Sequence, residues 1–258
     1  MPAETARPGR NFLRFSLRTL LVGMVVCGAV SGFAARVHSR AQRQKQILID
    51  AARIGGSIRY DYECYSESPW YTAQRWLAPK IGPDYVGSVL ILNFHATPPR
   101  EWRKVLPAAA ELQSIDHFAA CCEELEASDI ELLSKFTRMK QIHFHYCSEV
   151  PSLEAFGKLQ QLELLSIHSS GVTSAKLAPL QQLPNFKTLD LCNSDATDEV
   201  VPLLATFTAL EELHAEGSEM TAAGLAGLSK SKSLRVLCVD HTQQSVRDAL
   251  TGVTVSLK

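Results

Sequence analysis

Histidines and cysteines recur in this chain at a regular spacing, and they are the side chains best suited to chemistry. His145, His168 and Cys192 are separated by 23 and 24 residues, and Glu216 follows after another 24. His and Cys bind zinc, copper or nickel, and His also titrates near neutral pH. These side chains can act together only if the chain folds into a structure that repeats with the same period.

A repeated motif supplies this period. It reads LxxLxLxx(S/T/C), and its first apolar residue, here called the anchor, recurs at intervals of 23, 27, 23, 24, 24 and 24 residues. The seven anchors are Val89, Leu112, Met139, Leu162, Phe186, Leu210 and Leu234. A period of about 20–29 residues with this pattern is typical of a solenoid in which each repeat contributes one short strand and a helical return.

The apolar pattern within each repeat predicts which side chains enter the core. Alternate strand residues share a face, so the third and fifth residues after the anchor should be buried and the second, fourth and sixth exposed. Apolar residues three, six and nine places before most anchors indicate a short α or 3₁₀ helix with one buried stripe. The second repeat departs from the pattern, because His117 occupies a core position and about three extra residues around 121–127 predict a bulge or loop.

Residues 85–258 resemble leucine-rich repeat proteins, in particular a bacterial form whose units run L-T-D-x-x-L-x-x-L-x-x-L. The resemblance implies an α/β leucine-rich repeat solenoid, with parallel strands on the concave side and short helices on the convex side. We expect the concave face to bind a protein partner, with Phe118, Tyr146 and Leu164 as its main apolar contacts. The candidate binding residues are Asp116, Phe118, His143, His145, Tyr146, Leu164, His168, Asp190, Cys192, His214, Glu216 and Asp240.

The histidines of this face suggest a second hypothesis. Neighbouring strands lie about 4.8 Å apart, so His145, His168 and Cys192 should stand in a row, with Glu216 next and His143 beside them. We take the first three as candidate metal ligands, or as groups that make partner binding depend on pH. The plainer interpretation is that exposed strand positions simply tolerate polar residues, since no known metal-binding spacing is present.

The N-terminus has a different character. The first 45 residues carry eight basic side chains against one acidic, and seventeen uncharged residues run from Thr19 to Ala35. A helix over this stretch would be about 25 Å long, close to the roughly 30 Å of a bilayer core, which predicts a single membrane span.

A signal peptide cleaved at Gly32-Phe33-Ala34 is the alternative, in which case the protein is secreted. Lipid attachment at Cys27 is a third possibility. Basic residues flank the apolar stretch on both sides, so charge does not predict which side of the membrane holds the repeats.

The segment after the span is expected to cap the solenoid. A helix over residues 36–54 should end at Gly55-Gly56, and a strand is expected over Ser57–Glu63. We expect Trp70 and Trp76 to pack on this cap. This segment, together with the opening R-F-S-L-R-T-L-L, resembles membrane-anchored repeat proteins of planctomycete bacteria, which implies no activity.

The chain therefore divides into five parts, the last closing with a helix over 246–250 and a strand over 253–257. They are a basic tail (1–18), a transmembrane helix (19–35), a juxtamembrane helix and N-terminal cap (36–87), about seven leucine-rich repeats (88–244) and a C-terminal cap (245–258).

The remaining features point to a binding protein without catalysis. The seven cysteines include no CxxC pair and are expected to be mostly free thiols, which favours a cytoplasmic repeat domain. No nucleophile elbow, phosphate-binding glycine loop or HExxH motif supports an enzyme, a hydrolase on the concave face included. The net acidic repeats argue against nucleic acid as a partner. No cofactor is expected, and neither the partner nor the oligomeric state follows from the sequence.

Overall fold

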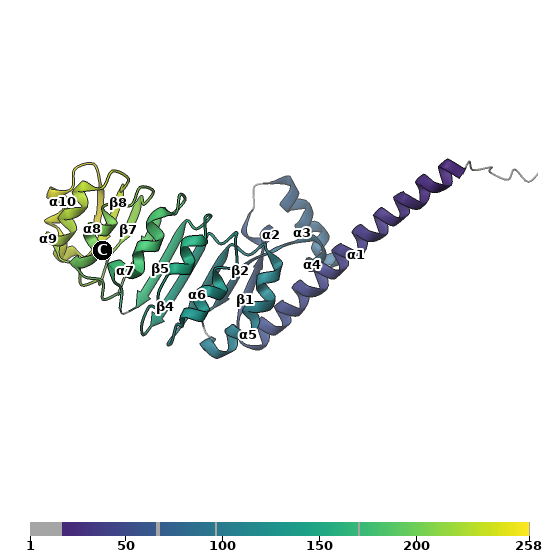
Figure 1. The fold of residues 1–258 in the computed structure, drawn as a ribbon, viewed down its shortest axis with the longest axis horizontal. Helices are drawn as coiled ribbons and strands as arrows, with labels where there is room; N and C mark the ends of the chain where they lie inside the picture. The colour runs from purple at the N-terminus through teal and green to yellow at the C-terminus, as the bar shows by residue number, and fades with distance from the viewer. Residues whose placement is uncertain (1–16, 66–67, 96, 170, 258) are drawn as a thin grey trace, which may run out of the picture.

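We describe a computed structural model covering residues 17–65, 68–95, 97–169 and 171–257. Residues 1–16, most of the predicted basic tail, lie outside the described residues. The described strands form one sheet in chain order (Figure 1). These are β1 (Ser57–Tyr60), β2 (Val89–Phe94), β3 (His117–Cys121), β4 (Gln141–Cys147), β5 (Leu164–Ser169), β6 (Thr188–Asp190), β7 (Glu212–His214), β8 (Val236–Val239) and β9 (Thr254–Leu257). β1 pairs antiparallel with β2, and every later pair is parallel.

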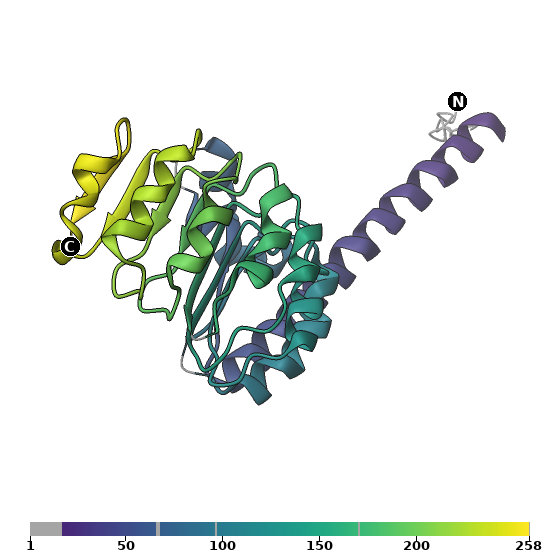
Figure 2. The same ribbon diagram turned by 60° about the vertical axis from the view of Figure 1, so that its left-hand side comes forward.

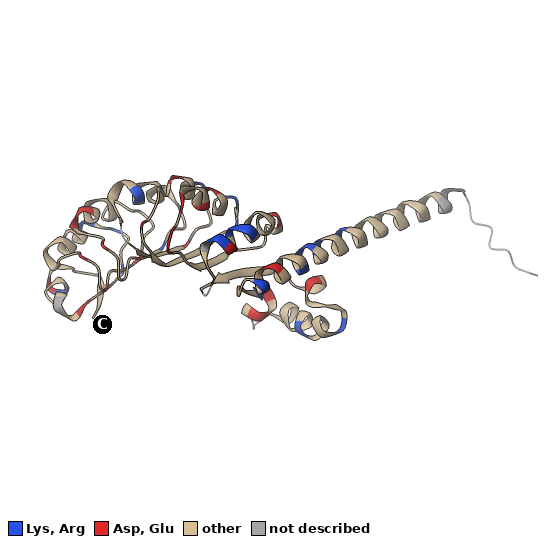
Figure 3. Cartoon of the chain, turned by 90° about the horizontal axis from the view of Figure 1, so that it is seen from below, with Lys and Arg blue, Asp and Glu red and all other residues tan. Residues whose placement is uncertain are grey.

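Short helices return the chain from each strand to the next. They are α5 (Pro99–Ala109) with η1 (Ala110–Leu112), α6 (Ala127–Leu133), η2 (Glu154–Lys158), α7 (Ser174–Leu177) with η3 (Ala178–Gln182), η4 (Asp198–Val200) with α8 (Val201–Leu204), α9 (Ala222–Leu225) with η5 (Ala226–Lys230), and η6 (His241–Gln243) with α10 (Val246–Ala249). Three of them begin at a threonine, Thr173, Thr197 or Thr221, whose hydroxyl accepts a backbone N–H of the first turn. Figure 3 shows the helices along the outer side of a curved body and the strands along its inner side.

The core lies between the strands and these helices. The third and fifth residues after most anchors are buried, as with Leu165 and Ile167 in β5, and they pack on helix residues such as Phe156 and Leu180. Parallel repeat strands and short helical returns around one continuous core are the architecture that the motif predicts. The prediction of an α/β leucine-rich repeat fold is therefore confirmed.

The second repeat begins three residues later than predicted. Leu92 of β2 pairs with Phe118 of β3, not with Ile115, so the anchor of this repeat is Ile115 and not Leu112. The extra residues lie before the strand, in α5 and η1, and not in the predicted bulge after it. As a result Phe118 enters the core, while His117 turns to the inner face and is partly exposed.

The predicted membrane helix and the helix after it form one continuous helix, α1 (Leu17–Arg53). Residues 21–36 are all exposed, and α1 extends away from the curved body (Figure 2). Further along, Ala41, Gln44, Ile47 and Ala51 form a buried stripe on the cap. Gly55, at φ 83°, then ends the helix and leads the chain into β1. By length and composition, the segment from Leu21 to Arg53 could cross a membrane.

The N-terminal cap differs from expectation in two places. Its strand ends at Tyr60, and α2 (Asp61–Cys64) follows, because the Asp61 carboxylate accepts the backbone N–H of Tyr62 and so favours a turn. Trp70 and Trp76 do not pack on the cap, and they are 66% and 64% exposed. They lie on the outer face of α3 (Pro69–Ile81), whose buried residues are Gln74 and Ala78. The short helix α4 (Pro83–Val86) follows.

Candidate functional site

Two rows of side chains in register cover the inner face of the sheet. The register pairs Ser166 with Asp190, Asp190 with His214, and His214 with Cys238. The first row consists of Asn93, Ala119, His143, Ser166, Asp190, His214 and Cys238. The second row stands two residues further along each repeat and consists of His95, Cys121, His145, His168, Cys192, Glu216 and Asp240.

Four histidines within the first four repeats lie together and are called the histidine group here: His95, His143, His145 and His168. The ring centroid of His145 lies 4.7 Å from that of His95 and 4.9 Å from that of His168, the latter an edge-on contact. The Nδ1 atoms of His145 and His168 are 3.4 Å apart. Burial, together with positive charge on His168, His95 and His143, lowers the pKa of His145 to about 4. His145 is therefore neutral at neutral pH.

Ser166, His168 and Asp190 meet at the centre of the face, but not as a catalytic triad. The Ser166 hydroxyl donates to Asp190 Oδ2 over 2.9 Å, and His168 Nε2 lies 3.2 Å from the same oxygen and 3.3 Å from Ser166 Oγ. A triad needs the histidine between the serine and the carboxylate, with a different ring nitrogen on each. Here Nε2 faces both, and Ser166 is buried. The arrangement stabilises an ionised carboxylate and does not activate a nucleophile.

The charge of Asp190 follows from its neighbours. Burial alone would raise its pKa, but hydrogen bonds from Cys192, Ser166 and His168 outweigh burial and lower the pKa to about 2. Asp190 therefore carries a negative charge at neutral pH. It lies between the histidine group and the acidic residues of the later repeats.

The three predicted metal ligands do not form one cluster, because His145 and His168 lie together but Cys192 does not join them. Among the described residues, the set of three ligand-type side chains whose ligand atoms all lie within 4.8 Å of one another is Cys192, His214 and Glu216, and not His145, His168 and Cys192. The reason is the local hydrogen bonding, because His168 Nε2 is held by Asp190 while the Cys192 thiol donates to Glu216 Oε2 over 2.9 Å.

Two other predicted residues do not lie on the inner face. Phe118 is fully buried, where it packs edge-on against Trp102 with ring centroids 5.6 Å apart. Asp116 is also buried, and its Oδ1 lies 2.6 Å from Nδ1 of His117. Both errors have the same cause, since the second repeat begins three residues later than predicted.

The other predicted residues do lie on the face. Leu164 is partly exposed at the start of β5, and Asp240 accepts the backbone N–H of Gly217 over 2.9 Å. Tyr146 is 81% exposed. Its φ of 56° is a left-handed conformation, which directs the side chain away from the sheet.

His95, His117 and Cys121 also lie on the inner face, although the sequence pattern does not predict them as binding residues. Cys121 Sγ lies 3.7 Å from His95 Nδ1, so Cys121 stands beside the end of the histidine group that is nearest the N-terminal cap. A frame starting at Ile115 would have found His117 and Cys121, because it restores apolar residues at the third and fifth positions.

Tyr146 separates two hollows along the edge where the strands end. One has a volume of about 470 Å³ and is lined by His95, Cys121 and Tyr146 among others. The other, of about 410 Å³, is lined by Tyr146, His168 and Asn193 among others. The tyrosine is therefore an exposed aromatic side chain with space on both sides.

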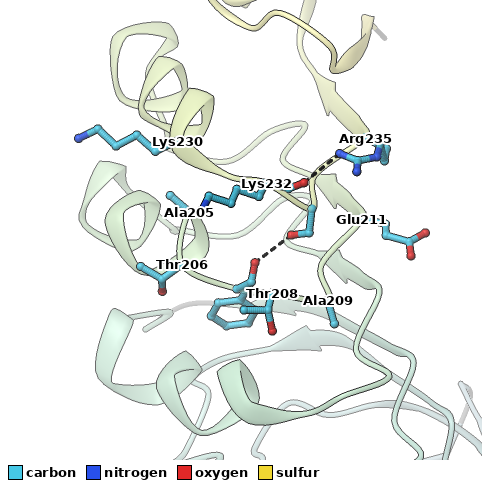
Figure 4. Close-up of a pocket in the computed structure, with 10 residues that line it drawn as sticks. Ala205, Thr206, Thr208, Ala209, Glu211, Lys230, Lys232 and Arg235 are labelled. Atoms are coloured by element: carbon cyan, nitrogen blue, oxygen red, sulfur yellow. Dashed lines mark hydrogen bonds between the residues drawn. The ribbon is translucent and has the colours of Figure 1, made fainter.

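A larger hollow, of about 780 Å³, lies elsewhere, where the chain enters β7 and β8. Lys230, Lys232, Arg235 and Glu211 line it (Figure 4). The Arg235 guanidinium donates to the Lys232 carbonyl over 3.1 Å, so this cation is partly used by the loop itself. None of its lining residues belongs to the two rows of the inner face.

Comparisons with known proteins bear on the fold only. No protein-family model matches the chain, and no curated protein matches it. Among solved structures, 71 chains match. One is a TLR13–ssRNA13 complex, with a TM-score of 0.44 and 15% identity over 64% of this chain. Two more are an internalin (inlF) and an internalin C2 (inlC2) of Listeria monocytogenes, with TM-scores of 0.40 and 0.42 and identities of 14% and 15%, each over 72% of this chain.

These solved structures are mostly longer than the chain, which spans 27% of the first, 61% of the second and 91% of the third. Similarity at this level adds nothing to the strand order and repeat spacing already described. Seven consecutive parallel strands, each carrying the LxxLxL pattern and each followed by a short helical return, make the chain a leucine-rich repeat solenoid.

Proposed function

We propose that this chain is a non-catalytic, membrane-anchored binding module that holds a protein partner on its inner face. The observation that carries the proposal is Tyr146, an 81% exposed aromatic side chain between two hollows on a sheet whose other face is fully packed. Exposed aromatic residues flanked by space are typical of the few contacts that dominate a protein interface. A rigid sheet also loses little conformational entropy when a partner docks.

The charges of the inner face suggest the character of the partner. His145 is neutral at neutral pH, whereas Asp190, Glu212, Glu216 and Asp240 lie together towards the C-terminal repeats. A partner that matches this face would place aromatic or apolar groups beside Tyr146 and basic groups over the acidic end, since complementary charge directs the orientation of docking.

The N-terminal helix supports a location at a membrane. Leu21, Val25, Val30 and Phe33 of α1 are more than half exposed, and the folded body covers none of them. Such a surface is stable in lipid and costly in water. The segments R-F-S-L-R-T-L-L and GG-S-I-R-Y-D-Y-E, which resemble membrane-anchored repeat proteins of planctomycete bacteria, are the basis in the sequence for the same proposal. Secretion after cleavage near Ala34 is the alternative.

Site-specific photo-crosslinking in intact membranes tests the binding proposal. A photoreactive residue replaces Tyr146 in one variant and Gln182, an exposed residue of η3 on the outer side, in a matched control. We expect a discrete protein adduct from position 146 and none from position 182. Equal adducts from both positions, or none from 146 in cells that express the protein, would contradict binding at the inner face.

A pH-dependent form of this function is the second candidate, and the ring contacts of His145 favour it. The rings of His95 and His168 lie within 5 Å of the His145 ring by centroid, so any proton gained in acid would add a repelling positive charge to the same small area. Under this candidate, the crosslink at position 146 weakens between pH 7.5 and 5.5 in the wild type, and substituting His95 and His168 by Gln removes the change. An unchanged crosslink yield across this range would contradict it.

A further inference from the structure

Three side chains of different chemistry converge where β6 and β7 end. Cys192 follows β6, while His214 ends β7 and Glu216 stands two residues beyond it. Because Asp190 pairs with His214 in the parallel register, the residues two places further, Cys192 and Glu216, also stand opposite each other. Their ligand atoms, together with those of His214, all lie within 4.8 Å of one another. All three side chains are partly buried, so the set is held by the fold.

The distances between the ligand atoms suit a transition-metal ion. Cys192 Sγ is 2.9 Å from Glu216 Oε2, which in turn is 4.0 Å from His214 Nδ1. Tetrahedral zinc, with bonds of about 2.0–2.3 Å to N, O and S, holds its ligand atoms roughly 3–4 Å apart. Small side-chain rotations would therefore place a zinc ion between these three groups.

The carboxylates around these three side chains also favour a bound cation. His214 Nε2, the ring nitrogen turned away from Glu216, lies 3.9 Å from Glu212 Oε2. At metal sites the second nitrogen of a ligating histidine commonly donates to a carboxylate that orients the ring, and Glu212 would reach that position by rotating its side chain towards His214. Asp190 adds a negative charge beside Cys192, whose backbone N–H it accepts over 3.0 Å. Asp190 Oδ2 lies 3.2 Å from His168 Nε2, and Glu212 and Glu216 each place a carboxylate oxygen within 4.0 Å of a ring nitrogen of His214.

The histidine group does not offer an equivalent site. His145 and His168 present two nitrogens 3.4 Å apart, but His168 Nε2 is held by Asp190, and no third ligand atom completes a set within 4.8 Å among the described residues. Within the part of the chain that the structure describes, the pair of His95 and Cys121 likewise has no third ligand atom within 4.8 Å.

We propose that Cys192, His214 and Glu216 form a binding site for one zinc-like divalent ion on the inner face. Binding displaces the proton of the Cys192 thiol, which goes to solvent, and forms bonds from the thiolate sulfur, His214 Nδ1 and a Glu216 oxygen. Three protein ligands leave the fourth tetrahedral position open for water or for a donor from a bound partner. The site goes beyond the proposed partner binding and does not depend on it.

Cobalt substitution of the full-length protein, purified without an affinity tag in detergent and treated with chelator, tests the site. We expect one equivalent of Co²⁺ to produce a near-ultraviolet thiolate-to-cobalt charge-transfer band, with visible bands of tetrahedral intensity that zinc abolishes. Cys192→Ser should remove the charge-transfer band. His214→Gln and Glu216→Gln should weaken binding at least about tenfold, and Glu212→Gln about tenfold through the orientation of His214.

Two matched variants on the same face are the controls. Cys121→Ser and His168→Gln remove ligand-type side chains outside the proposed set and should leave the cobalt spectrum and affinity unchanged. Circular dichroism checks that every variant is folded. Absence of a charge-transfer band in the folded wild type would overturn the proposal. Retention of the band in Cys192→Ser with loss in Cys121→Ser or His168→Gln would overturn it as well. Neither result touches the crosslinking test of partner binding, which needs no metal.

Discussion

His145 is the inner-face residue whose charge depends most clearly on its neighbours. Its pKa in the folded protein is about 4, lowered by burial and by the nearby histidines, whereas an unfolded histidine titrates near 6.5. Between these two values the unfolded chain binds the proton and the folded protein does not. The contribution of His145 to stability is therefore fully present above about pH 6.5 and is lost as the pH falls towards 4.

A His145→Gln variant should accordingly lose less stability in acid than the wild type. We expect the free energy of unfolding to fall between pH 7 and pH 4.5 by about 1 kcal/mol less in the variant, a figure reduced from the full linkage value because the ring is partly exposed. Urea unfolding at the two pH values measures this difference. His241→Gln, at an exposed site, is the control and should behave like the wild type. Parallel acid losses in all three proteins would contradict the assigned cause.

At the scale of the strand, alternation decides whether a side chain serves the core or the surface. Phe118 and Tyr146 were both expected on the binding face, but the first is fully buried among Trp102, Phe94 and Phe144, and the second is exposed. The two residues therefore differ in what they contribute, although both are aromatic and lie in neighbouring strands.

Alanine at these two positions separates folding from binding. Phe118→Ala should lower the free energy of unfolding by about 3–5 kcal/mol, because it leaves a cavity in a packed core. Tyr146→Ala should change it by less than about 0.5 kcal/mol, as expected for an exposed site, yet reduce partner capture at the inner face about tenfold or more. Chemical denaturation gives the first two values. A stable Phe118→Ala protein would mean that the register of the second repeat is wrong.

At the scale of the whole molecule, α1 has two parts with different environments. The part over residues 21–36 is exposed and apolar, while the part after it packs on the cap through Ala41, Gln44, Ile47 and Ala51. His38 marks the beginning of this contact, since its Nδ1 lies 2.7 Å from the Tyr85 hydroxyl. The folded body and the apolar segment can therefore be separated between these two parts.

Deletion of residues 1–36 should release the protein from the membrane fraction and leave its thermal unfolding temperature unchanged. Deletion of residues 1–53 should lower that temperature, because it uncovers the surface on which the buried stripe of α1 packs. Alkaline extraction of membranes and thermal denaturation measure the two effects. An intact mass that begins after Ala34 in the wild-type protein would instead establish cleavage and contradict the anchor.

Much of the fold follows from the order of residues alone. The spacing of about 24 residues predicts one strand and one helical return per repeat, and alternation within the strand places Leu165 and Ile167 inside and His168 on the face. These predictions succeed because both periods are local properties: strand residues alternate, and each repeat packs mainly on its neighbours.

Only the tertiary structure decided the frame of the second repeat and the identity of the clustered ligands. Leu112 and Ile115 are both apolar, and the length of α5 and η1 selects the second as anchor. Likewise, alternation puts His168, Cys192 and Glu216 on one face, but the hydrogen bonds of Asp190 and Glu216 determine which side chains meet. A sequence period specifies the face on which a side chain lies, whereas contacts within a few ångströms depend on rotamers and neighbours that only the folded chain brings together.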